Sequence, residues 1–213
     1  MTLYLDALGK SNTSANKDSW TYNNITSIFE GFKWGGDGWS NIVTNTSSDP
    51  NIPNETEAGL RLISGDKVTI NYKPLERTYQ SKNAFACSFK FRVTNAANES
   101  EELISCIDTY GTGFIIKANE AIFNTKEGKT VSTKFASGEI YNIGFVSFPE
   151  TSYDAVNSNR LYLYVNGIIC GTVERPTTDS IYQENPTNII IKADSCTLDL
   201  FSIRMYNQQL TDE

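Results

Sequence analysis

The acidic residues best placed for sugar hydrolysis are Glu99 and Glu101, in the segment NESEELI. A retaining glycosidase needs two carboxyl groups about 5 Å apart that face one groove, and alternate positions of a strand face the same side. The next alternate position is Leu103, so a third acid is missing, and both glutamates precede the apolar run rather than lying in it. We interpret the pair as the solvated edge of a loop and expect no enzyme.

Histidine is absent from the chain. Its absence excludes a histidine-based catalytic triad and removes the commonest nitrogen ligand for zinc. The segment GGDG at 35–38 lacks the Lys-Ser/Thr pair and the following helix that a phosphate-binding loop needs. The remaining chemistry is recognition by side chains that bind without reacting.

Aromatic residues are the first candidates for such recognition, because the apolar face of a sugar ring stacks on a flat side chain. Tyr162 and Tyr164 alternate with aliphatic residues in the segment RLYLYV, so they share the opposite face of one strand, and Asn166 follows them. This face is a candidate sugar platform. The alternative is that both faces of the strand are covered and the tyrosines belong to the core or support another domain.

Three further aromatic residues lie in glycine-rich segments. Trp34 and Trp39 flank the GGDG segment, where they could grip a ligand, although tryptophan is usually buried for packing. Tyr110 lies beside Asp108 in the segment DTYGTG and is a candidate for a site at the rim of the fold.

Composition favours one large all-β domain over residues 1–213, with 39% hydrophobic and 20% charged residues. The net charge is -7 and no cluster of Lys and Arg interrupts it, so nucleic acid is not an expected partner. No apolar run is long enough to cross a bilayer, and MTLYLDALGK has no secretory signature. We expect no membrane insertion.

Alternating polarity predicts the strands, most clearly from Ala84 to Val93, where Cys87 falls on the apolar face as a buried free thiol. Asn166-Gly167 predicts a two-residue hairpin turn, and Ser64-Gly65-Asp66 predicts another between the strands 60–63 and 68–72. The series of strands predicts an all-β fold, either a two-sheet antiparallel β-sandwich or a barrel, and the long loop 149–159 is typical of the sandwich. Further predicted strands are 3–5, 26–34, 40–43, 103–108, 114–117, 121–124, 129–133, 139–147, 161–165, 168–172, 189–191 and 198–206.

The order of three motifs over residues 84–213 resembles laminin-G-like domains of the concanavalin A-like lectin–glucanase superfamily. These motifs are the SFKF strand, the YVNG hairpin and the closing FSIRMYN strand. The segments LYLDALGKSNTSANKDSW and IFEGFKWGGDGWS are similar to the opening of such domains in tail and baseplate proteins of phages and prophages of Gram-positive bacteria. The resemblance implies a jelly-roll sandwich that presents sugars or partner surfaces.

The same resemblance implies two rim features. Laminin-G-like domains often hold one Ca²⁺ through loop aspartates, which makes Asp108 and then Asp194 the candidate ligands. The alternative is that both aspartates bond their own turns. Many extracellular members carry one disulfide near the C-terminal end, which makes Cys170 and Cys196 a candidate pair.

The function that we expect is a non-catalytic carbohydrate-recognition module, the host-glycan-binding part of a phage tail or baseplate protein. Its partners would be a bacterial cell-surface glycan, other virion subunits and further copies of itself as a homo-oligomer. Its location would be the virion tail or an extracellular surface. Because the chain stops at QLTDE, we expect a domain taken from a longer protein. The rivals are a structural interaction module without sugar binding and a glycoside hydrolase.

Overall fold

The computed structural model describes residues 3–6, 43–45, 60–70, 72–76, 85–147, 160–174 and 180–206. Over these residues the chain is all-β, as predicted, and contains no helix that could span a membrane. The predicted strand 26–34 and the candidate residues Trp34 and Trp39 lie outside the described residues.

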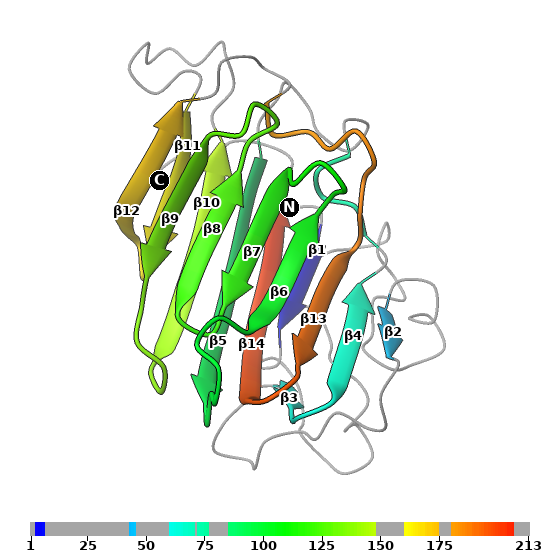
Figure 1. Ribbon diagram of the computed structural model, residues 1–213, viewed down its shortest axis with the longest axis vertical. Helices are drawn as coiled ribbons and strands as arrows, with labels where there is room; N and C mark the ends of the chain where they lie inside the picture. The colour runs from blue at the N-terminus through cyan, green and yellow to red at the C-terminus, as the bar shows by residue number, and fades with distance from the viewer. Residues whose placement is uncertain are drawn as a thin grey trace.

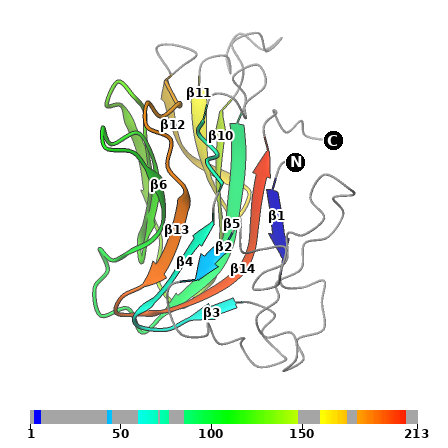
Figure 2. The same cartoon turned by 90° about the vertical axis from the view of Figure 1, so that its right-hand side faces the viewer.

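Two antiparallel sheets stack as the layers of a sandwich (Figures 1 and 2). The first sheet has the strand order β1-β14-β5-β10-β11-β12, with β3 also pairing with β14. Its strands are β1 Leu3–Asp6, β3 Leu60–Leu62, β5 Phe85–Thr94, β10 Ile140–Ser147, β11 Arg160–Val165, β12 Ile168–Glu174 and β14 Thr197–Tyr206.

The second sheet has the order β2-β4-β13-β6-β7-β8-β9 and carries the site described below. Its strands are β2 Val43–Asn45, β4 Asp66–Ile70, β6 Glu102–Ile107, β7 Gly113–Lys117, β8 Glu120–Asn124, β9 Thr130–Lys134 and β13 Ile189–Ala193.

The core lies between the two sheets and follows from the alternation of residue types. On β5 the apolar positions, including Cys87, are buried, whereas Ser88, Lys90 and Arg92 between them are only partly buried. Rings from both layers meet in the middle, where the centroids of Phe89 and Phe114 lie 5.2 Å apart. The predicted inward face of this strand and the buried thiol are confirmed.

The predicted hairpin around Gly65 is wrong, because its two strands belong to different sheets. β3 pairs with β14 in the first sheet, and β4 pairs with β13 in the second. The turn itself exists: the Asp66 amide donates to the Ile63 carbonyl at 2.9 Å, and Gly65 has a φ of 95°. Turn chemistry fixes where a chain reverses, but it does not fix the sheet in which the next strand pairs.

The Asn-Gly hairpin is confirmed between β11 and β12. Asn166 and Gly167 have φ angles of 51° and 81°, the conformation that a two-residue hairpin turn requires. The turn is also tied to β10, since the Asn142 amide donates to Asn166 Oδ1 at 2.8 Å and the Asn166 amide donates to the Asn142 carbonyl at 2.8 Å.

Candidate functional site

A groove of about 400 Å³ lies on the outer face of the second sheet. Ile190 points outward into this groove, because its neighbours along the strand, Ile189 and Ile191, point into the core. In the register of the sheet, Ile190 pairs with Thr69 of β4 on one side and with Ser105 of β6 on the other. Three adjacent strands therefore supply one continuous floor for the groove.

The groove combines an apolar surface with hydrogen-bonding groups. Ile107 and Pro186 extend the apolar floor from Ile190, while Thr187 and Asn188 add a hydroxyl and an amide from the loop before β13. Ligand pockets of this volume commonly have such a lining, with few polar groups that orient the ligand. The groove can therefore hold a small ligand that has one apolar face and several hydroxyl groups.

Two opposite charges line the groove. Glu102, at the start of β6, accepts a hydrogen bond from the Ser105 hydroxyl at 2.7 Å. Lys73 follows β4, has an exposed side chain and forms no ion pair with any described residue. The nearby Lys192 is already bound to Asp194 at 2.8 Å, and this hydrogen bond is the main cause that raises the pKa of Lys192.

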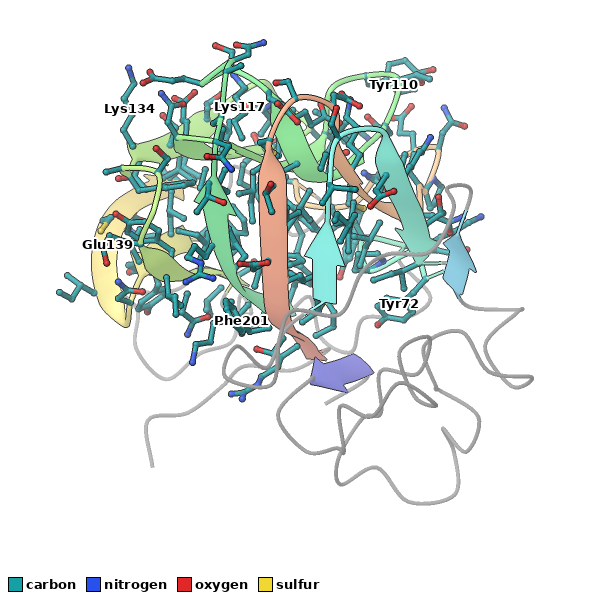
Figure 3. The ribbon with its side chains drawn as sticks, turned by 90° about the horizontal axis from the view of Figure 1, so that it is seen from below. Tyr72, Tyr110, Lys117, Lys134, Glu139 and Phe201 are labelled. Carbon is teal, nitrogen blue, oxygen red and sulfur yellow. The ribbon has the colours of Figure 1, made fainter. Side chains whose placement is uncertain are left out.

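Asp108 directly follows Ile107, the last residue of β6 and part of the groove lining, and it organises the adjoining loops. Its carboxylate accepts hydrogen bonds from the backbone amides of Tyr110 at 3.0 Å, Thr112 at 2.9 Å and Glu184 at 3.2 Å. These bonds hold the β6–β7 loop against the loop that precedes β13. Tyr110 projects away from the body of the molecule with 69% of its surface exposed (Figure 3).

A buried glutamine, which the sequence analysis missed, joins the same two loops. Gln183 Nε2 donates to the carbonyls of Thr112 at 2.9 Å and Cys106 at 3.2 Å, while Oε1 accepts from the amide of Thr187 at 2.8 Å. Gly113 is needed beside it, because a Cβ atom there would lie 1.9 Å from the Cys106 carbonyl oxygen. Nothing in the local sequence marks Gln183, since its partners on β6 and the β6–β7 loop are more than 70 positions away.

The tyrosine platform lies on the outer face of the first sheet, away from the groove. Tyr162 is only 7% exposed and Tyr164 is half-buried, with their ring centroids 6.4 Å apart. Asn166 is exposed, but its side-chain oxygen is used by the turn. The role of these residues in sugar binding stays a prediction. The burial of Tyr162 favours the alternative in which this face is covered, because a covered ring has no free surface for stacking.

The two candidate calcium ligands make other contacts in the structure, and their role in metal binding stays a prediction. Asp108 accepts hydrogen bonds from three backbone amides, and Asp194 is paired with Lys192. Within the described ranges, no three or more Asp, Glu, Cys or His residues are grouped to hold a metal ion. The hydrogen bonds of Asp108 match the alternative in which an aspartate bonds its own turn.

The predicted disulfide between Cys170 and Cys196 is wrong, because both cysteines are free. Cys170 is exposed on β12 at one edge of the first sheet, and Cys196 is buried in the turn between β13 and β14. These two elements lie on different sides of the molecule (Figure 1).

Glu101 is not a solvated residue, which corrects our interpretation of the Glu99–Glu101 pair. It is 5% exposed and accepts hydrogen bonds from the amides of Asp194 and Ser195, from the Ser195 hydroxyl and from the Cys196 thiol. Burial raises its pKa, but these hydrogen bonds outweigh burial and hold the pKa of Glu101 below its ordinary value. Its role is to fasten the β13–β14 turn to the start of β6. Glu99 is exposed and bonds only Asn119, at 3.0 Å, among the contacts described.

No protein-family model matches the sequence, and the search of curated proteins finds no relative. Solved structures with the same fold include binding domains of botulinum neurotoxins. The type C structure described by its interaction with two ganglioside molecules has a TM-score of 0.59 at 13% identity, over 79% of this chain and 44% of that one. The serotype D/C binding domain has a TM-score of 0.57 at 13% identity, over 99% of this chain and 49% of that one.

The serotype D binding domain has a TM-score of 0.52 at 15% identity, over 80% of this chain and 48% of that one. These likenesses show a β-sandwich fold. The chain spans less than half the length of each of these structures, so the ligands of the whole toxin domains do not transfer to it directly.

Proposed function

We propose that this chain is a non-catalytic carbohydrate-recognition module whose site is the groove on the second sheet together with Tyr110. The observation that carries the proposal is the groove itself, with an isoleucine and proline floor, hydroxyl and amide groups around it and an exposed aromatic residue in the adjoining loop. A sugar ring has one apolar face and a periphery of hydroxyl groups, which is the pattern that this lining complements.

The finer proposal is that the module is the host-glycan-binding part of a phage tail or baseplate protein. The resemblance of the N-terminal segments supports this context. The botulinum neurotoxin type C structure of the same fold, described by its interaction with two ganglioside molecules in cell entry, supports recognition at a cell surface. A tail displays many copies of one module, so a weak single site gains avidity without new contacts. Its partners are then a glycan of the bacterial envelope, neighbouring virion subunits and further copies of this chain.

A glycan array probed with the purified chain tests the function, and EDTA in half of the samples tests whether calcium contributes. We expect binding that survives EDTA and that Tyr110→Ala weakens about tenfold, since stacking on an aromatic ring supplies about 1–2 kcal/mol. Ile169→Ala, an exposed substitution on β12, is the matched control and should leave binding unchanged. A pull-down of Gram-positive cells with the same two variants then tests the host context.

The second candidate function is a structural module that only docks on a neighbouring subunit. The edge strand β12 favours it, because Ile168 and Ile169 are 69% and 53% exposed at the border of the first sheet. An exposed apolar edge strand is a surface on which another chain can pair. If this is the function, the array shows no binding, and Ile168→Asp dissolves a dimer detected by analytical ultracentrifugation.

A further inference from the structure

We infer that the groove on the second sheet selects an acidic sugar, a pyranose bearing one carboxylate, and that Lys73 binds this carboxylate. The inference rests on the proposed function and specifies its ligand. It depends on how charge is distributed between Lys73 and Glu102, the two charged residues that line the groove.

Lys73 is the cation that the groove offers to a ligand. Its side chain is exposed and lines the groove, and no described carboxylate neutralises it. Two other lysines of the second sheet are paired: Lys117 with Glu120 at 3.5 Å and Lys192 with Asp194 at 2.8 Å. An ammonium group that no described carboxylate neutralises, in a groove of this size, is complementary to an anionic group of the ligand.

Glu102 sets the orientation of the ligand. One of its oxygens accepts from Ser105, and an ionised carboxylate has further capacity to accept hydrogen bonds but none to donate. It therefore binds sugar hydroxyl groups and repels a second anionic group. The sugar must place its hydroxyl edge toward Glu102 and its carboxylate toward Lys73, with its apolar face on Ile190.

A single carboxylate matches this groove better than a phosphate. The chain carries a net charge of -7, and one exposed lysine balances one negative charge. A phosphate monoester carries a charge of about -1.5 to -2 at neutral pH and is usually held by several cations or by a helix N-terminus. The residues that line the groove supply neither. Charge balance thus favours a uronic or nonulosonic acid over a phosphorylated sugar.

The experiment is binding of the intact chain to matched pairs of immobilised sugars. Each pair consists of an acidic sugar and its neutral counterpart, such as glucuronic acid with glucose, and N-acetylneuraminic acid with its methyl ester. We expect the acidic member to bind more tightly, and we expect high salt to reduce this preference. Lys73→Gln should weaken binding of the acidic sugar about fivefold, which corresponds to an exposed ion pair, and should leave the neutral sugar within a factor of about two.

Two variants separate charge at the site from the charge of the whole chain. Lys134→Gln removes the same charge from β9, away from the lining of the groove, and should leave the preference intact. Lys73→Arg should restore binding of the acidic sugar. If Lys134→Gln and Lys73→Gln have equal effects, or if the acidic and neutral sugars bind equally, the acidic-sugar inference is wrong while sugar recognition stands.

Failure of the function itself has a different result. A chain that binds no sugar of either kind, while its melting temperature shows it to be folded, contradicts both the inference and the proposed function. A preference for phosphorylated sugars over carboxylated ones contradicts the charge argument alone.

Discussion

The two outer faces of the sandwich differ in how far the side chains that point away from the core are covered. On the first sheet, Tyr162 is 7% exposed, and Asp199 is 1% exposed and paired with Arg92 at 2.7 Å. On the second sheet, Ile190 and Ile122 are only half-buried, and Ile190 lies in the floor of a groove. An aromatic and a charged residue are thus buried on one outer face, while an isoleucine in the middle of the other lies in the floor of a groove. Residue type alone does not identify the binding face.

The largest effect that we expect comes from Tyr162→Ala on the covered face. Removing a buried aromatic side chain should lower the free energy of unfolding by about 3 kcal/mol, because the cavity is only partly refilled. Tyr110→Ala, at 69% exposure, should change it by less than about 0.5 kcal/mol. Urea denaturation of the two variants measures the contrast. If the Tyr162→Ala variant is stable but fails to bind sugar, the binding site lies on the first sheet instead of the second.

The next effect on stability contrasts Glu101, which is buried, with Glu99, which is exposed. Glu101→Gln removes a charge that accepts four hydrogen bonds and should cost about 2 kcal/mol at neutral pH. Glu99→Gln should change stability little, since Glu99 is exposed.

The pH dependence checks the same assignment. The pKa of Glu101 is lower in the folded chain than in the unfolded chain, so its stabilisation is complete above the unfolded value of about 4.3 and is lost as the pH falls through the folded value. The difference in unfolding free energy between the wild type and Glu101→Gln should therefore shrink from neutral pH to about pH 3. A difference that stays constant over this range would exclude ionised Glu101 as the source of the stability.

A smaller effect is expected on the open face. Ile190→Ala should cost about 1 kcal/mol, because a half-buried side chain loses less contact than a core residue. It should also weaken sugar binding, since Ile190 lines the groove. Ile122→Ala on the same face, outside the groove, is the control: it should lose similar stability and keep binding. Equal binding by the two variants would remove Ile190 from the site.

The sequence was sufficient for the architecture but not for what covers each face. Alternation identified the inward face of β5, and Asn166-Gly167 identified the hairpin between β11 and β12. Both features depend on residues that are close in the chain. The pairing of β3 with β14 and the burial of Glu101 depend on segments roughly a hundred or more positions away. The local sequence pattern does not indicate such contacts.

The candidate site was predictable only in part for the same reason. The glycine-rich segment around Tyr110 indicated a rim loop, and the structure places this residue at 69% exposure. The groove arises where β4, β13 and β6 become neighbours, and these strands are far apart in the sequence. Ile190 lies in an uninterrupted run of three isoleucines, so its outward direction was visible only after Ile189 and Ile191 were found in the core.

The smallest effect is expected from reducing agents. Because Cys170 is on an open edge and Cys196 is in a covered turn, dithiothreitol should leave the melting temperature unchanged, whereas a disulfide would contribute about 2–4 kcal/mol. A thiol reagent applied to the native chain should modify Cys170 first. Burial raises the pKa of Cys106 and of Cys196 to about 12, so these thiols should react only after unfolding. Fast reaction at Cys196 would mean that the β13–β14 turn opens in solution although Glu101 holds it with four hydrogen bonds. The contrast between covered and open positions would then be wrong for this turn.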